Sequence, residues 1–181
     1  MEYLDVVDMQ GNPTGERVER TKAHREGYRH RTSHVWIVRK KHGSVEILLQ
    51  KRCKGKDSFP ECYDISSAGH IPAGDDYVQS ALRELKEELG VTVKEEDLIN
   101  CGQVQKQVDT EFGGVPYHDR QISCVFLLWL DQEEEEFNLQ EEEVDSVRWR
   151  DYAQCRGMVA ADTLPNCIIM EELNMLEGHF A

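Results

Sequence analysis

One amphipathic helix, expected at residues 76–89, constrains the fold of this chain more than any other segment. Val78, Leu82, Leu85 and Leu89 recur at spacings of four, three and four residues, which places them on one side of an α-helix. A glycine follows the last leucine and acts as a stop signal. Because a single apolar stripe must pack against another element, this helix is expected to lie on the core of a globular protein.

Three carboxylates lie on the other side of the same helix. Glu84 precedes Glu87 and Glu88 by three and four residues, so the three side chains are neighbours on one surface. Like charges at this spacing cost a few tenths of a kcal/mol per pair, roughly, in an isolated helix. A divalent cation would turn the repulsion into coordination, because Mg²⁺ and Mn²⁺ prefer oxygen ligands. The alternative is a solvated acidic face.

Strands are expected around this helix. Apolar or alternating runs that predict them lie at residues 4–8, 34–39, 45–50, 99–108, 118–130 and 144–149. Further helical segments are expected at 151–160 and 165–177, and a loop rich in glycine and proline at 55–74. This mixture predicts an α/β (α+β) sandwich. A length of 181 residues fits a single domain, 1–181.

Charge and cysteine content narrow the class of protein. The chain has 35 acidic and 21 basic residues, a formal net charge of −14, which disfavours binding to nucleic acid or to an anionic membrane. The longest apolar run, 124–130, is far shorter than a membrane span. Six scattered cysteines without a C-x-x-C pair predict a reducing, cytoplasmic environment.

Residues 69–91 closely resemble the Nudix box, G-x5-E-x7-R-E-U-x-E-E-x-G-U, in which U is aliphatic. The positions that match at the correct spacing are Gly69, Arg83, Glu84, Leu85, Glu87, Glu88, Gly90 and Val91. One position departs from the pattern, because Asp75 stands where the family usually has glutamate. The resemblance implies a Nudix-type α/β/α sandwich with a mixed central sheet and a loop–helix–loop catalytic motif.

The resemblance also implies a chemistry. It suggests a pyrophosphohydrolase that uses Mg²⁺ (or Mn²⁺) to cleave a diphosphate linkage in a nucleoside diphosphate derivative or a related small molecule. The family frequently forms homodimers, and the sequence leaves the oligomeric state open. The metal ligands carried over by position are the carboxylates of Glu84, Glu87 and Glu88 and the carbonyl of Gly69.

Other residues of the box would support these ligands. Arg83 would brace the carboxylates, and Asp75, one methylene shorter than glutamate, would support the site with its reach to the metal left open. The general base would be Glu87 or Glu88. A later loop offers Glu143, or its neighbour Glu142, as an alternative base.

A finer resemblance is to type 1 isopentenyl-diphosphate isomerase and its bacterial relatives. His30 and His70 fall where that isomerase has metal-binding histidines, and Arg52 and Lys56 fall where it has basic residues near the diphosphate. We expect Arg52 and Lys56 to contact substrate phosphate. His70 is expected to brace the box loop rather than to bind metal.

The positions that isomerisation needs are changed. Ala68 replaces the cysteine that handles the allylic proton, and a methyl group cannot exchange protons. Asp119-Arg120-Gln121 replaces a Glu-x-Glu metal pair, and the upstream histidine is displaced by one position to His24. Hydrolysis is therefore the leading hypothesis. Isomerase-like activity and a non-catalytic metabolite-binding domain are the alternatives.

Overall fold

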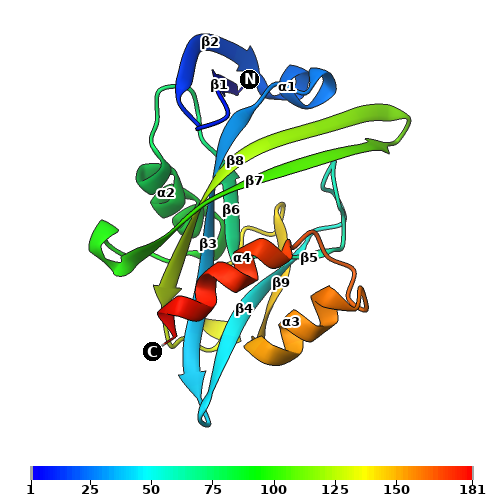
Figure 1. The fold of residues 1–181 in the computed structure, drawn as a ribbon. Coiled ribbons are helices and arrows are strands. Elements are labelled where there is room, and N and C mark those ends of the chain that lie inside the picture. Colours follow the sequence, from blue (N-terminus) through cyan, green and yellow to red (C-terminus); the bar gives the residue numbers. More distant parts are fainter. Residues whose placement is uncertain (1, 181) are drawn as a thin grey trace.

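The computed structural model describes residues 2–180, and a twisted mixed sheet lies at its centre (Figure 1). Across the sheet the strands follow the order β5 (Tyr63–Asp64), β4 (Ser44–Arg52), β3 (His30–Lys41), β8 (Val115–Trp129) and β7 (Leu98–Phe112). β6 (Ser67–His70) pairs with another stretch of β3, and β9 (Val144–Asp151) pairs with β4. The sheet is mixed because β3 runs parallel to β8 and antiparallel to β4 and β6.

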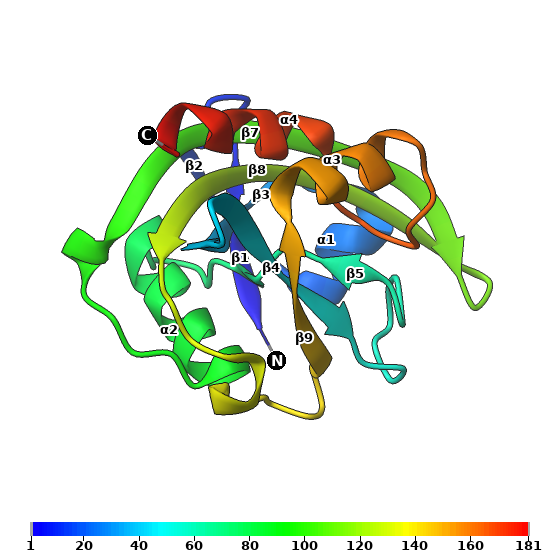
Figure 2. The same cartoon turned by 90° about the horizontal axis from the view of Figure 1, so that it is seen from below.

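Helices cover both faces of this sheet (Figure 2). α2 (Tyr77–Leu89) lies on one face, and α3 (Tyr152–Ala160) and α4 (Met170–Leu176) lie on the other. Alternate side chains of β3 point to opposite faces of the sheet and so pack in different cores. Val35 and Ile37 pack with the leucines of α2, whereas Trp36 and Val38 pack with residues of α3 and α4. The predicted α/β sandwich is therefore confirmed.

α2 is the helix that the leucine stripe predicts. Its N-cap, Asp76, accepts a hydrogen bond from the Gln79 amide, and Gly90 ends it in the left-handed conformation. Leu85 and Leu89 are fully buried against the sheet. These local signals fix where α2 begins and ends, and therefore which way its carboxylates point.

Two segments differ from the prediction. The expected loop at 55–74 contains the short strands β5 and β6, because its backbone completes the edges of β4 and β3. The expected helix at 165–177 is shorter and begins at Met170. Main-chain groups of Pro165 and Cys167 instead hydrogen-bond to Tyr63, which keeps this stretch extended.

The N-terminal part of the chain lies at one end of the sheet. β1 (Tyr3–Val7) and β2 (Pro13–Glu19) form a hairpin that leads into α1 (Arg20–Glu26), at the top of Figure 1. Three single turns of 3₁₀ helix complete the described chain, η1 (Glu95–Asp97), η2 (Glu134–Glu136) and η3 (Glu177–His179). Between residues 2 and 180, none of the helices is long and apolar enough to cross a membrane.

Candidate active site

A glycine of β6 and a glutamate of α2 pack directly against each other. Gly69 pairs with Ser33 of β3, and the Glu84 carboxylate packs directly on the open side of this glycine. A Cβ at position 69 would come closer than 3.0 Å to the Glu84 side chain, a separation that real Cβ atoms do not show. The glycine at this position is therefore needed to admit the carboxylate.

Arg83 holds the surrounding acidic groups together. Its guanidinium donates to Glu84 Oε1 at 2.7 Å, to Asp75 Oδ2 at 3.4 Å and to the His70 carbonyl at 3.2 Å. Its Nε also lies 3.8 Å from Glu87 Oε2. Arg83 thus contacts two of the box glutamates, and Asp75 joins the cluster through Arg83. Burial raises the pKa of Glu84 even with this cation beside it.

Glu88 is the most buried of the three carboxylates. Only 5% of the residue is exposed, and Oε2 accepts hydrogen bonds from Ser67 Oγ at 2.7 Å and from the Ala68 amide at 3.3 Å. Burial raises the pKa of Glu88 to about 7. A carboxyl group with a pKa close to neutral pH is suited to proton transfer. Two hydrogen bonds thus hold the Glu88 carboxylate in one orientation beside β6.

Lys56 connects the later acidic loop to this cluster. Its ammonium forms an ion pair with Glu143, which precedes β9. The same positive charge acts on Glu88 and opposes the rise of that pKa. Burial lowers the pKa of Lys56. The neighbouring Glu142 is exposed, and its carbonyl accepts a hydrogen bond from the Cys53 thiol. Of these two glutamates, Glu143 is the one that Lys56 links to the site.

The Arg52 guanidinium is engaged by the protein itself. It donates to Asp64 Oδ2 at 3.1 Å and to the carbonyls of Ser58 and Phe59. These bonds tie the end of β4 to the segment that follows it. Arg52 and Lys56 lie on the same side of the site, and their contact with substrate phosphate stays a prediction.

A second cluster lies on the other side of β6. His24 of α1, His30 of β3 and His70 of β6 bring one ring nitrogen each to within 4.8 Å of one another. Asp119 Oδ1 of β8 lies 3.5 Å from His30 Nε2 and 3.7 Å from His24 Nε2. Because successive side chains of a strand point to opposite faces, Gly69 faces α2 while the next residue, His70, faces this histidine cluster.

The histidine cluster has the properties of a cation site. His30 Nε2 and Asp119 Oδ1 are buried and have no hydrogen-bond partner among the described residues. Burial lowers the pKa of His24 to about 3 and also lowers that of His30 and His70. Neutral imidazoles keep a lone pair for a metal, and a site rich in nitrogen suits transition metals better than Mg²⁺.

The histidine cluster holds one more imidazole than the sequence predicted, that of His24. The displacement of His24 by one position suggested a weakened metal site, yet α1 carries its imidazole to 3.2 Å from that of His70. The His70 carbonyl accepts a hydrogen bond from Arg83, while its ring joins the cluster. Asp119 takes part although its neighbours do not reproduce the Glu-x-Glu pattern. His30 and Asp119 lie on the same face of the paired strands β3 and β8, and this placement is the signal that could have identified the pair.

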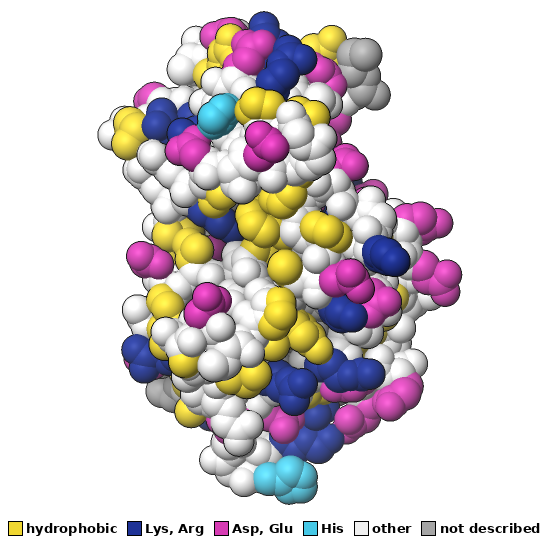
Figure 3. All heavy atoms as spheres, turned by 90° about the vertical axis from the view of Figure 1, so that its right-hand side faces the viewer, with side chains coloured by type: hydrophobic (Ala, Val, Ile, Leu, Met, Phe, Trp, Pro, Cys, Tyr) yellow, Lys and Arg dark blue, Asp and Glu magenta, His cyan; other side chains and the backbone are white. Residues whose placement is uncertain are grey.

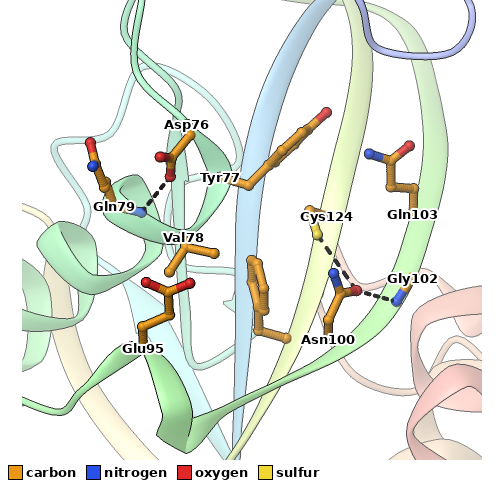
Figure 4. A pocket seen from close by; sticks show the side chains of 10 residues that line it. Asp76, Tyr77, Val78, Gln79, Glu95, Asn100, Gly102, Gln103 and Cys124 are labelled. Atoms are coloured by element: carbon orange, nitrogen blue, oxygen red, sulfur yellow. Dashed lines mark hydrogen bonds between the residues drawn. The ribbon is translucent and has the colours of Figure 1, made fainter.

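A pocket of about 470 Å³ opens beside the first turn of α2 (Figure 4). Its wall includes Asp76 and Gln79 on one side and Asn100 and Gln103 of β7 on the other, with Cys124 between them. None of the box carboxylates lines this pocket. It therefore lies apart from the acidic site.

An aromatic group closes over the histidine cluster where the β7–β8 hairpin meets the segment after β4. Tyr117 stacks on His24 with ring centroids 4.9 Å apart, and Phe59 and Phe112 pack edge-to-face against Tyr117 and each other. The side of the molecule that carries the hairpin tip shows hydrophobic side chains across its middle, with charged side chains around them (Figure 3). This side offers apolar contact area close to the histidines.

Known proteins share this chain's sequence pattern. The model of the NUDIX domain matches residues 28–166. An uncharacterised Nudix hydrolase of Clostridium acetobutylicum is 36% identical over 143 residues, which are 79% of this chain and 66% of that protein. Nudix hydrolase 3 of Arabidopsis thaliana is 36% identical over 163 residues, 89% of this chain but 21% of the plant protein. The chain thus spans less than two thirds of each of these two relatives.

Two further similarities bear on subgroup and fold. An isopentenyl-diphosphate Δ-isomerase of Photobacterium profundum is 32% identical over 90 residues, half of this chain and 49% of that protein. A crystal structure from Deinococcus radiodurans superposes with a TM-score of 0.69 at 17% identity, covering 96% of this chain and 98% of that one. The box geometry and the family model agree, and the chain belongs to the Nudix family.

Proposed function

We propose that this protein is a metal-dependent pyrophosphohydrolase that cleaves a diphosphate linkage in a nucleoside diphosphate derivative or a related small molecule. One observation carries the proposal: Arg83 gathers the carboxylates of Glu84, Glu87 and Asp75 beside Gly69. Three carboxylates held this closely suit Mg²⁺ or Mn²⁺ as a ligand set rich in oxygen. Membership of a family whose relatives are named hydrolases supports the same chemistry.

Each residue has a defined task in this proposal. Glu84, Glu87 and Glu88, with the Gly69 carbonyl, hold the cation, and Arg83 keeps the glutamates in place. A bound divalent cation supplies positive charge that offsets the charge on the diphosphate and favours attack by water. Lys56 lies where its ammonium can pair with a phosphate oxygen in exchange for Glu143.

The proton of the attacking water needs an acceptor. We assign this task to Glu88 first, because Ser67 and the Ala68 amide hold its carboxylate in one orientation. Glu87 and Glu143 are the other candidates. Single substitutions to glutamine separate the three when turnover is compared at saturating metal, because the variant of the base is then expected to lose the most turnover.

The substrate class is tested with purified protein and a panel of diphosphates. The panel holds nucleoside di- and triphosphates, ADP-ribose, NADH, coenzyme A and isopentenyl diphosphate, each with Mg²⁺ or Mn²⁺. Products are identified by mass and by phosphate release. Metal-dependent cleavage of one class supports the proposal and names the substrate. Tight binding of one compound without turnover in any metal would instead support a metabolite-binding domain.

The histidine cluster favours a second candidate, isomerisation of an allylic diphosphate. His24, His30, His70 and Asp119 form a site for a transition metal, and one relative is named as an isomerase. Ala68 argues against this activity. It faces the same side of β6 as His70 and stands at the position where the isomerases that this chain resembles carry their cysteine. Exchange of solvent deuterium into isopentenyl diphosphate would establish isomerase chemistry, and its absence would exclude it.

We also propose that residues 1–181 work as one domain in the cytoplasm, with neither nucleic acid nor membrane as a partner, and that two copies form a homodimer. All six cysteines are free thiols in the described chain, which fits a reducing compartment. Size-exclusion chromatography with light scattering tests the dimer. A monomer at micromolar concentration would contradict it.

A further inference from the structure

A carboxylate of the N-terminal hairpin binds the loop at residues 71–76, which leads into α2. Asp5 of β1 is 8% exposed, and its Oδ2 accepts hydrogen bonds from the Gly74 amide at 2.8 Å and from Arg31 Nη2 at 3.1 Å. The same Arg31 nitrogen donates to the Asp75 carbonyl at 3.0 Å. Two successive residues of the loop are therefore fixed through one buried carboxylate.

The backbone of the hairpin also bonds to this loop. The Ala73 amide donates to the Tyr3 carbonyl at 2.8 Å, and Leu4 forms a β-bridge with Pro72. Gly74 has a φ of +93°, a left-handed conformation that favours glycine. The loop thus turns sharply at the residue whose amide Asp5 binds, so that its conformation depends on β1.

The loop in turn reaches the carboxylate cluster. The Asp75 side chain contacts Arg83, and Arg83 contacts Glu84 and Glu87. Asp75 is one methylene shorter than the glutamate usual at this position of the box, so its main chain must lie correctly for the carboxylate to reach Arg83. Asp5 and Arg31 hold that main chain in place.

We propose that Asp5 is a positioning residue that, through the loop at residues 71–76, sets the affinity of the box carboxylates for a divalent cation. This role rests on the proposed function of those carboxylates. Asp5 precedes residue 28, where the match to the family model begins, so the chain adds a support from outside the matched segment. Arg31 acts with Asp5 as the second part of this support.

The test compares Asp5→Asn with Arg17→Gln. Arg17 is 62% exposed at its side chain, and its Nε lies 3.4 Å from Asp5 Oδ1, whereas the loop and Arg31 bind Oδ2. It is therefore a control that leaves the hydrogen bonds of Oδ2 in place. Two quantities are measured in each folded variant: Mg²⁺ affinity by calorimetry, with Mg²⁺ alone as the probe, and amide hydrogen exchange of residues 71–76. Mg²⁺ is chosen because the histidine cluster favours transition metals.

Asp5→Asn is expected to weaken Mg²⁺ binding about tenfold, since it removes the charge from two charge-assisted hydrogen bonds. Exchange at residues 71–76 should rise by a similar factor, while Arg17→Gln changes both quantities less than twofold. A purely structural role would lower the melting temperature and leave the Mg²⁺ affinity of the folded protein unchanged. That result would overturn the proposal.

Two further variants complete the test. Glu84→Gln must lose most of the Mg²⁺ binding of the wild type. If wild type and Glu84→Gln bind Mg²⁺ equally, the proposed metal site itself is wrong, and the role of Asp5 falls with it. Should Asp5→Asn fail to fold, Arg31→Lys replaces it, because lysine keeps the charge but cannot span Asp5 and the Asp75 carbonyl. Arg31→Lys is expected to weaken Mg²⁺ binding as well, and unchanged affinity would overturn the proposal.

Discussion

Replacing Gly69 by alanine perturbs the carboxylate cluster with a single methyl group. The new Cβ would come within 3.0 Å of the Glu84 carboxylate, whereas ordinary contact between carbon atoms requires about 3.5 Å or more. The Glu84 side chain must therefore move away by roughly 1 Å or more. Arg83 holds this carboxylate at 2.7 Å, so the retreat also moves the guanidinium that braces Glu87.

Gly69→Ala is expected to lower the rate of catalysis more than the stability of the fold. A misplacement of about 1 Å in a catalytic group lowers the rate roughly 10²-fold, so we expect kcat/KM for Gly69→Ala to fall by about that factor. The free energy of unfolding should change by only about 1 kcal/mol, the low end for overpacking, because a side-chain end can swing away. Gly69 has no positive φ, so alanine adds no backbone strain.

The assay measures initial rates with the diphosphate that the substrate panel identifies, at saturating Mg²⁺, together with denaturant unfolding. Gly157→Ala is the matched control, because a Cβ at this position of α3 would meet nothing within 4 Å. It should leave activity unchanged and increase stability by about 0.5–1 kcal/mol. If Gly69→Ala retained activity within threefold of wild type, the packing of Glu84 on Gly69 would not matter for catalysis.

Three other substitutions test separate parts of the site. Glu88→Gln should lower kcat by about 10²–10⁴-fold with little change in melting temperature, because the amide oxygen still accepts from Ser67; unchanged kcat would exclude Glu88 as the base. Co²⁺ absorption spectra should show a nitrogen-rich site in the wild type and a signal weakened at least tenfold in His30→Ala, and equal spectra would contradict the histidine centre. Asp64→Asn should destabilise the protein by about 3 kcal/mol, since it leaves the Arg52 charge without its partner. Burial opposes the ionisation of Asp64, yet Arg52 keeps its pKa below the ordinary value of 3.8. The advantage of wild type over Asp64→Asn should therefore be full above about pH 4 and shrink as the pH falls below that. A stability difference that did not change with pH below about pH 4 would contradict the pairing.

The box helix could be predicted because its signals are local. The leucine stripe identifies the buried face of α2, and the i+3 and i+4 spacing makes Glu84 the neighbour of Glu87 and Glu88. The burial of Glu88 against Ser67 differs from the prediction, which placed all three carboxylates on the side away from the leucines. The contact of Arg83 with Glu87 follows from the same i+4 geometry, whereas its bond to the adjacent Glu84 does not. Periodicity within one element was therefore sufficient for only part of this half of the site.

Contacts between distant segments could not be predicted in the same way. β5 and β6 have two and four residues, too few for a hydrophobic pattern, and only their partners in β4 and β3 define them. His24 lies on a helix of seven residues whose position against β8 decides whether its ring reaches His70. Spacing along the chain gives no information about that position.

Charge alone also does not reveal what a side chain binds. Arg52 is expected at the substrate phosphate, and its charge gave no indication that its guanidinium also donates to Asp64 and to two carbonyls of its own loop. Asp5 showed no signal in the sequence, because its partners Gly74 and Arg31 lie 69 and 26 residues away. Such long-range pairs become visible only when the backbone brings them together.

The most direct measurement of the central claim is the turnover of Glu87→Gln beside that of wild type, across a range of Mg²⁺ concentrations. Lys86→Gln is the control, because Lys86 is exposed and adjacent. We predict Mg²⁺-dependent cleavage of a diphosphate by wild type and Lys86→Gln, and at least a hundredfold loss in Glu87→Gln, in line with the loss of a positioned catalytic group. Turnover of Glu87→Gln within threefold of wild type at every Mg²⁺ concentration would contradict the metal site of the box.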